Sequence, residues 1–325
     1  LVTWHPSTGA FLGVHAVEDV VRLGLAVTPV VLLFPETVYG HGGAPHEPLS
    51  FDAVVTLFGM IPWNFRADIF LVLILAGAVY LLGWFRLRRQ AEGAATVFGL
   101  ALYIGGIAAL LTALLSPVDR LAAERLSMHM VQHILLLMVA PLGILLANPF
   151  PAVIWGLPAG IREHFAALFR EGGLLRSVLS MLTLLPVAWT LYVANLWAWH
   201  YPALYQAALE VWWLHDLEHC LFFGTAMLFW CPITNTAPLF SAARSLGSRI
   251  IYLLAATLQN ILLGMAISLP ERVLYPFYGV GRVIEKLSPI QDQALGGGIM
   301  WVSAHMYLIP ILVLVAHRLV AEDEA

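Results

Sequence analysis

Seven long apolar segments run through this chain, and no other feature of its sequence restricts the fold so strongly. Each is close to the roughly 20 residues that a helix needs to cross a hydrocarbon core about 30 Å thick. They lie at about 68–85, 96–115, 127–147, 177–197, 211–231, 249–269 and 295–316. Only 11% of the residues are charged, whereas a soluble domain carries about 25%. We therefore predict an all-α, polytopic membrane protein, with a bundle of seven transmembrane helices over residues 67–318.

Arginine and lysine in the connecting loops predict which way this bundle faces. Nine of them follow the odd-numbered segments, and six lie in the opposite loops. Because basic residues accumulate in cytoplasmic loops, we expect the amino terminus outside and residues 319–325 as a cytoplasmic tail. The expected location is a bacterial inner (plasma) membrane, with the lipid bilayer around the helices. The net charge of -4 and the scattered basic residues argue against nucleic acid as a partner.

The first 40 residues differ in pattern from the rest. Residues 1–20 show no sustained period, which suggests a leader or an over-extended start. Residues 21–40 combine an arginine, an apolar run and small residues suited to cleavage after Gly40, so we predict a signal peptide. An uncleaved anchor is the alternative, but the run is interrupted by Pro29 and is short for a bilayer.

Cleavage there would leave residues 41–66 as an extracytoplasmic tail that begins at a histidine. Its histidines are His41 and His46. A free amino terminus beside an imidazole binds copper or nickel. The sequence thus predicts a metal-capturing role for these two residues.

Two pairs of histidines stand at the starts of the third and fifth apolar segments. His129 and His133 form one pair, and His215 and His219 form the other. Residues four apart share one stripe of a helix. Histidine in hydrocarbon is costly, so such residues face a partner, a metal or a proton path inside the bundle. Both pairs are predicted at similar depth on the outer side, where His200 ends the fourth segment. Hydrogen bonds between the helices are the alternative to metal binding.

Thioether sulfur accompanies the first pair, because Met128 and Met130 flank His129. Imidazole together with soft sulfur favours Cu(I). Methionine on an apolar helix usually serves packing, and the helical geometry lets at most one of the two share the site of His129. The predicted copper ligands are His129, His133, His215, His219 and Met130.

Several other polar residues could assist such a site. Glu218 and Asp216 could orient the imidazoles or relay protons. The run HDLEH also matches H-x-x-E-H, the inverted zinc-protease pattern, but no third ligand in a soluble cleft follows it, so we do not expect a protease. Asp292 and Gln293 precede three glycines at the outer mouth of the seventh segment, and His305 is predicted near mid-membrane. We assign the following residues to a supporting shell or a relay: Glu218, Asp216, Asp292, Gln293 and His305.

Three runs of sequence, in order on three segments, resemble the CtaG family of cytochrome c oxidase assembly factors. They are MHMVQHILLLMVAPLGILLANP, HDLEHCLFFGTAMLFW and DQALGGGIMW, and the resemblance covers about residues 50–318. It implies a seven-helix bacterial membrane protein needed for maturation of haem-copper oxidases, with a role in copper delivery. It also implies that the recurrent family positions fall on Met130, His133, Glu218, His219, Asp292 and Gln293.

We therefore expect a non-enzymatic assembly factor that binds Cu(I) near the outer face and assists its delivery. The implied partners are haem-copper oxidase subunits and periplasmic copper chaperones. One alternative is a haem-binding membrane cytochrome with an axial histidine from each of two helices. A proton or metal transporter is the other, although the sequence shows no internal repeat of the kind common in transporters.

Overall fold

The computed structural model describes residues 63–90, 95–170, 172–234, 245–279 and 287–323, and every regular element in these ranges is helical. Side chains 317–323 are not described. Contacts divide the chain into a unit Leu57–Leu308 and a second unit made of Leu1–Thr56 and Ile309–Ala325. The predicted leader, the signal peptide, His41 and His46 lie outside the described residues.

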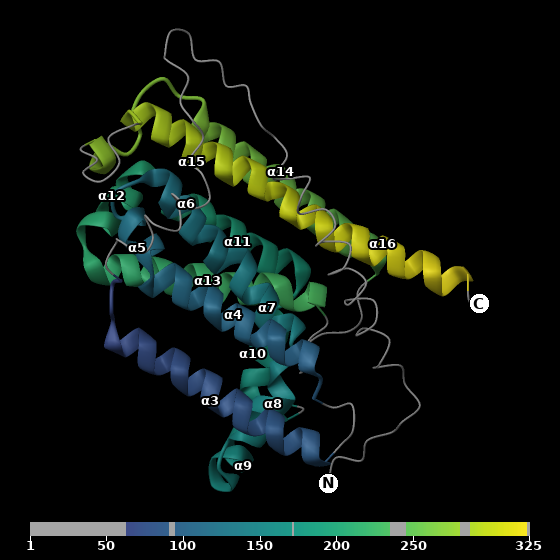
Figure 1. Cartoon of the computed structure of the whole chain (residues 1–325). Coiled ribbons are helices and arrows are strands. Elements are labelled where there is room, and N and C mark those ends of the chain that lie inside the picture. Colours follow the sequence, from purple (N-terminus) through teal and green to yellow (C-terminus); the bar gives the residue numbers. More distant parts are fainter. Residues whose placement is uncertain (1–62, 91–94, 171, 235–244, 280–286, 324–325) are drawn as a thin grey trace. The chain divides into compact units, whose positions relative to one another are not determined.

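The larger unit contains nearly all of the described helices (Figure 1). In chain order they are α3 (Ala67–Gln90), α4 (Val97–Leu115), α5 (Pro117–Ala122), α6 (Leu126–Ile134), the π-helix η1 (Leu135–Val139), α7 (Ala140–Leu146), α8 (Pro149–Gly156), α9 (Ala159–Leu168), α10 (Leu174–Leu182), α11 (Leu185–Trp199), α12 (Pro202–Glu210), α13 (Trp212–Thr234), α14 (Leu246–Ser268), the 3-10 helix η2 (Pro276–Gly279), α15 (Pro289–Ser303) and the 3-10 helix η3 (Ala304–Tyr307). In the second unit, α16 (Leu308–Asp323) continues over the described residues from Ile309.

Six helical stretches of the described chain are long and apolar enough to cross a membrane, or seven if α10 and α11 form one bent span. The six are Ala67–Gln90, Val97–Leu115, Leu126–Leu146, Trp212–Thr234, Leu246–Ser268 and Pro289–Ala316. The all-helical, multi-pass prediction is therefore confirmed, with the predicted fourth span broken in two.

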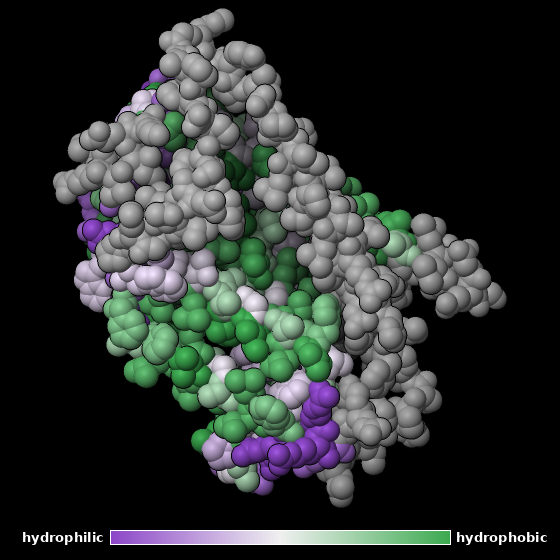
Figure 2. All heavy atoms as spheres, viewed as in Figure 1, coloured by the Kyte–Doolittle hydropathy of each residue, from purple (hydrophilic) through white to green (hydrophobic). Residues whose placement is uncertain are grey.

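The surface of these helices suits a lipid surrounding. On α3 the side chains of Leu71, Val72 and Leu75 are each about two-thirds exposed. Figure 2 shows a broad hydrophobic area over the described residues of this face. Because exposed apolar side chains on this scale are rare on soluble monomers, the helices are those of a membrane protein.

Prolines distort two of the spans. α10 and α11 meet at an angle of 71°, and Pro186 stands in the first turn of α11. Pro141 follows the π-helix η1 and cannot donate to the carbonyl of Leu137 four residues earlier. The Trp230 indole of α13 donates to that carbonyl at 2.9 Å. The third span is thus irregular at its centre, and a neighbouring helix satisfies the freed group, as a membrane interior requires.

Glycine allows α14 and α15 to pack closely. A Cβ on Gly297 would lie 2.5 Å from the backbone nitrogen of Ser268, and one on Gly264 would lie 2.7 Å from that of Trp301. Gly296 faces α6 instead, since its Cβ would meet Leu126 at 3.1 Å. Gly297 and Gly296 therefore let α15 lie close to α14 and α6 respectively.

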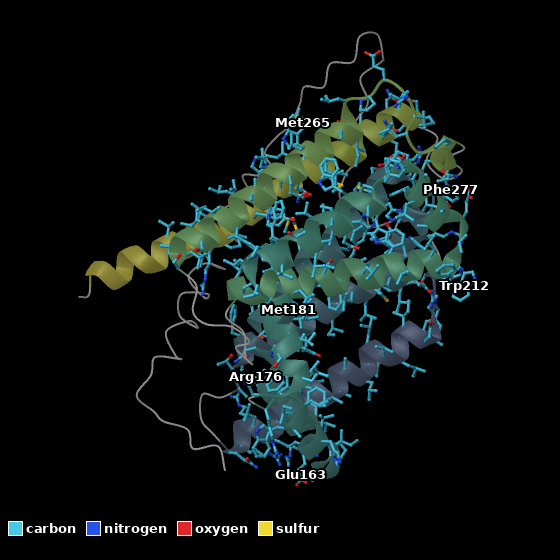
Figure 3. All side chains as sticks on the ribbon, turned by 180° about the vertical axis from the view of Figure 1, so that it is seen from behind. Glu163, Arg176, Met181, Trp212, Met265 and Phe277 are labelled. Atoms are coloured by element: carbon cyan, nitrogen blue, oxygen red, sulfur yellow. The ribbon has the colours of Figure 1, made fainter. Side chains whose placement is uncertain are left out.

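The loop before α15 folds back onto the larger unit in its described part, residues 270–279. Tyr275 and Tyr278 are 2% and 5% exposed. The hydroxyl of Tyr275 donates to the carbonyl of His200 at 2.8 Å. Figure 3 places Phe277 and Trp212 at the same end of the helices, and Arg176 toward the other end. The helices α6 and α13 both begin at this end.

Candidate metal centre

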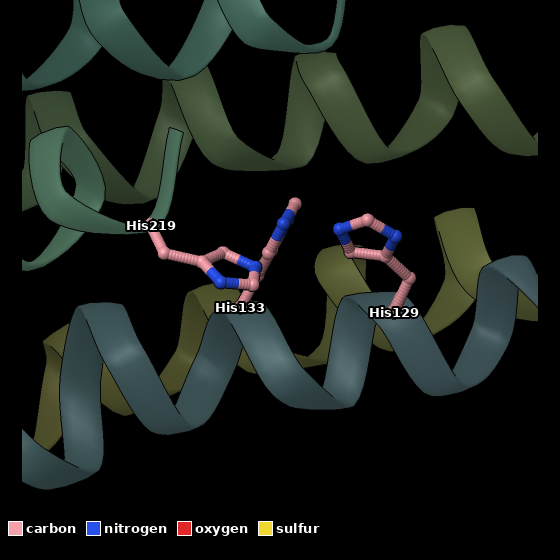
Figure 4. Close-up of side chains that lie close together, drawn as sticks. All are labelled: His129, His133 and His219. Atoms are coloured by element: carbon pink, nitrogen blue, oxygen red, sulfur yellow. The ribbon is translucent and has the colours of Figure 1, made fainter. Parts of the chain in front are cut away.

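α6 and α13 bring the two predicted histidine pairs together. The ring centroids of His129 and His133 are 4.3 Å apart, and those of His215 and His219 are 4.2 Å apart. Across the two helices, the centroid of His129 lies 5.3 Å from that of His215 and 6.3 Å from that of His219. Figure 4 shows His129 and His133 on one helix, with His219 reaching toward them from another. Each pair shares a helical stripe, and the two stripes face one another.

The described residues contain two groups of possible metal ligands. Within each group, the ligand atoms all lie within 4.8 Å of one another. One group consists of His129, His133 and His219, and all three residues are buried. The other consists of His129, His215 and Glu218, in which His215 is only partly buried. Both groups contain His129.

A fifth histidine, His200, also belongs to this cluster. Its ring centroid lies 5.3 Å from that of His133, and the residue is 3% exposed. It stands at the C-terminal end of α11. The sequence predicted it at the same end of the bundle as the two histidine pairs, but not among the ligands, because nothing local indicates that the end of α11 faces α6.

Within the described residues, most polar atoms at the centre of this cluster have no hydrogen-bond partner. They are the Nε2 atoms of His129, His133, His200, His215 and His219, the Nδ1 atom of His133 and both carboxylate oxygens of Glu218. His133 Nε2 and Glu218 Oε1 lie 3.5 Å apart. Leaving a buried donor or acceptor unpaired costs about 1–3 kcal/mol. Each neutral imidazole offers one lone pair, so these histidines and the Glu218 carboxylate fit a bound cation, which their lone pairs would coordinate.

Hydrogen bonds around the cluster determine which nitrogen of His129 is available. The Tyr278 hydroxyl donates to the carbonyl of Ala122 at 3.2 Å, so its one hydrogen is used. It must then accept from His129 Nδ1 at 2.8 Å and from the Tyr205 hydroxyl at 3.0 Å. His129 Nδ1 therefore carries the proton, and Nε2 presents a lone pair to the cluster.

His200 is oriented in the same way, although by the backbone. Its Nδ1 lies 2.8 Å from the carbonyl of Leu196, which can only accept. Nδ1 is thus the donor, and Nε2 carries the lone pair. Holding the far nitrogen in this manner is typical of metal-binding histidines.

Tyr205 and Tyr278 are functional candidates that the sequence reasoning missed. Burial raises the pKa of both phenols well above its ordinary value, so each keeps the hydrogen that it donates. Little in the sequence marked these two residues, because Tyr205 lies in the connection between the fourth and fifth segments and Tyr278 lies in the last long loop.

Asp216 pairs with Arg66 and not with the histidine cluster. Its two oxygens accept from Arg66 at 2.7 and 2.9 Å. Arg66 also pairs with Asp68, and hydrogen bonds to Asp68 and then Asp216 raise the pKa of its guanidinium. Asp216 therefore fastens the start of α13 to the start of α3.

Asp292 lies at the N-terminus of α6. Its carboxylate accepts from the backbone nitrogens of Leu126 at 2.7 Å and Ser127 at 3.4 Å, and from the Ser127 hydroxyl. It satisfies donors that the first turn of a helix leaves free. These contacts make Asp292 an N-terminal cap for α6, the helix that carries His129.

Gln293 holds the described part of the last loop. Its side chain accepts from the Leu274 nitrogen at 2.7 Å and donates to the Arg272 carbonyl at 3.1 Å. Neither Gln293 nor Asp292 is in the two groups of close ligand atoms. Their predicted part in a supporting shell or a relay stays a prediction.

Met130 and His305, which the sequence assigned to the site or its surroundings, lie in different environments. Met130 is fully buried and lines a small cavity beside His133, together with Met138 and Met300. The cavity measures about 10 Å³, close to the space of a single water. His305 is exposed, and its Nδ1 lies 3.0 Å from the carbonyl of Val302. Met130 therefore lies next to the cluster, whereas His305 faces outward.

Comparison with known proteins yields one family and several curated relatives. The family model described as cytochrome c oxidase caa3 assembly factor (Caa3_CtaG) matches residues 78–322. Uncharacterised proteins of Mycobacterium bovis and Mycobacterium tuberculosis are each 26% identical over 287 residues, which is 85% of this chain and 41% of theirs. A Mycobacterium leprae protein is 24% identical over 80% of this chain and 40% of its own length. The chain thus spans about two-fifths of these relatives. No solved structure matches.

Proposed function

Because the chain belongs to the cytochrome c oxidase caa3 assembly factor family, we propose that it serves the assembly of this oxidase by binding Cu(I) in the histidine cluster and assisting copper delivery. It would do so from the outer face of a bacterial inner membrane. The role is binding and transfer rather than catalysis. Its partners would be haem-copper oxidase subunits and, as donors of the ion, periplasmic copper chaperones.

One observation carries the proposal: among the described residues, the Nε2 atoms of five clustered histidines have no hydrogen-bond partner, and ligand atoms of His129, His133 and His219 lie within 4.8 Å of one another. Nitrogen ligands of this kind suit copper, and thioether sulfur favours its reduced form. Met130 adjoins His133 at the cavity. The predicted core ligands His129, His133, His215 and His219 all belong to the cluster, and we add His200.

The geometry supports copper over haem. Two axial imidazoles must stand on opposite faces of a flat macrocycle. Here, the rings of His129 and His133 meet edge to face at 4.3 Å. The ring of His133 also packs against Phe222 at 4.6 Å. A group as wide as haem would have to displace these contacts, whereas a single ion would not.

Copper content of the purified protein tests this function directly. We expect detergent-purified wild type, loaded and washed under reducing conditions, to retain copper, and the variants His133→Ala and His219→Ala to lose most of it. His305→Ala is the matched control, because His305 is exposed and outside the cluster. Unchanged copper in both cluster variants would refute the ligand assignment.

The same preparations address the alternatives. A Soret band in the absorption spectrum would identify a haem protein. Copper or proton flux in proteoliposomes would identify a transporter. We expect neither, since binding and hand-over to a partner need no passage through the bundle.

A further inference from the structure

The cluster contains two overlapping ligand groups rather than one. We call His129, His133 and His219 the imidazole site, and His129, His215 and Glu218 the carboxylate site. In each, the ligand atoms lie within 4.8 Å of one another. His129 belongs to both, so the two sites are adjacent positions for an ion.

His129 can serve only one ion at a time. Its Nδ1 is taken by the Tyr278 hydroxyl at 2.8 Å. Only Nε2 remains, and one lone pair makes one coordinate bond. An ion in either site therefore excludes a second ion from the other site whenever both would need His129.

The two sites differ in chemistry and in exposure. The imidazole site offers three nitrogens, all on buried residues. The carboxylate site offers a carboxylate and the partly buried His215, which stands one turn nearer the start of α13. Softer ligands retain Cu(I) better than a carboxylate does. The imidazole site should thus hold the ion more firmly, and the carboxylate site should be reached first.

Glu218 lies between the two positions. It belongs to the carboxylate site, and its Oε1 lies 3.5 Å from His133 Nε2 in the imidazole site. The adjacent charge of Arg66 is balanced, since Arg66 pairs with both Asp216 and Asp68. Glu218 therefore offers ligand atoms near both sites. The positive charge of Arg66 does not repel an ion there, because two carboxylates neutralise it.

We propose that a single Cu(I) ion moves between these sites by ligand exchange around His129, with the carboxylate site as the passage and the imidazole site as the resting place. This inference rests on the proposed copper function. In the exchange, His129 stays bound while His215 and Glu218 are replaced by His133 and His219. The ion stays Cu(I) throughout, so the exchange needs no oxidant or reductant.

Two histidines one turn apart on α13 allow a matched test. Cu(I) is bound to the purified full-length chain, and its affinity is measured by competition with bicinchoninate. The rate of release is measured by stopped-flow after mixing with excess bicinchoninate. We expect wild type to bind one Cu(I). We expect His215→Ala to keep its affinity within about threefold but to release the ion about 10-fold more slowly, and His219→Ala to lose about 10-fold in affinity.

Other outcomes would overturn the proposal in distinguishable ways. Equal losses of affinity in His215→Ala and His219→Ala would indicate a single four-ligand site. Two ions per wild-type chain would indicate independent sites. No binding by wild type would remove the proposed copper function itself, and the two-site inference with it. Two checks guard against misfolding: the more conservative variant His215→Asn, and a monodisperse elution profile for each variant.

Discussion

At the scale of single residues, the decisive detail is which nitrogen of His129 carries the proton. An imidazole binds a metal through a lone pair, so a ring with the wrong tautomer would present hydrogen to the ion. Tyr278, from a loop about 150 residues along the chain, determines that choice through its contact with Nδ1. Tyr278 is in this sense a positioning residue for the proposed site.

The variant Tyr278→Phe tests this role. Without the phenol oxygen, the Nδ1 hydrogen loses its acceptor and His129 is free to change tautomer. We expect the Cu(I) affinity to fall about 10-fold, as for other residues that orient a metal-binding histidine. Competition with bicinchoninate measures it. Tyr201→Phe is the control: this tyrosine is exposed, so its loss should leave the Cu(I) affinity unchanged. An unchanged Cu(I) affinity in Tyr278→Phe would contradict the assignment.

Asp292 gives a second prediction at this scale. Asp292→Ala removes the acceptor for the first backbone donors of α6 and should cost about 0.5–2 kcal/mol of stability. Circular dichroism melts in detergent would show a lower midpoint. The copper bound per folded chain should remain, because Asp292 is outside both ligand groups. Loss of copper at unchanged stability would instead favour the supporting or relay role predicted for Asp292.

At the scale of helices, the cluster depends on an irregular third span. The π-helix η1 follows directly on the turn that carries His133, and such insertions are often found at functional sites. The indole of Trp230 makes the distortion tolerable by taking the carbonyl of Leu137. This hydrogen bond joins α13, which carries His215 and His219, to the π-helix that follows His133.

Trp230→Phe should reveal that coupling. The ring remains apolar, but the buried carbonyl of Leu137 loses its donor, which should destabilise the fold by about 1–3 kcal/mol. The thermal midpoint measures this effect. Trp212→Phe is the control, because Trp212 is 75% exposed. Equal midpoints for the two variants would show that the indole hydrogen bond contributes little.

At the scale of the whole molecule, the histidine cluster lies at one end of the bundle. In the predicted seven-span topology, neighbouring spans run in opposite directions, so the starts of α6 and α13 share a membrane face. The structure agrees that these two starts lie together, since the rings of His129 in α6 and His215 in α13 are 5.3 Å apart. The excess of basic residues in the opposite loops predicts that this face is the outer one.

Labelling of intact cells tests the orientation. In a background with both native cysteines replaced, Trp212→Cys should react with a membrane-impermeant maleimide. Glu163→Cys, in α9 and well separated from Trp212 in Figure 3, should react only after lysis. The reverse pattern would place the cluster on the cytoplasmic side and remove delivery to an outer-face copper site.

Much of the architecture was predictable because it depends on local sequence. Apolar length predicted the spans, and the i, i+4 spacing predicted that each histidine pair shares a stripe. The irregular centre of the third span follows from the missing backbone donor of Pro141. In contrast, the site depends on contacts between distant segments, so His200, Tyr205 and Tyr278 could not be assigned from spacing alone.

By itself, the sequence determined that this chain is helical and crosses a membrane several times, because hydrophobic length and helical period are properties of neighbouring residues. Its motifs determined the family. Only the tertiary structure decided that five imidazoles meet, that Asp216 pairs with Arg66, and that Tyr278 takes the far nitrogen of His129. These outcomes depend on how helices pack and how a loop folds back, and no short stretch of sequence contains that information.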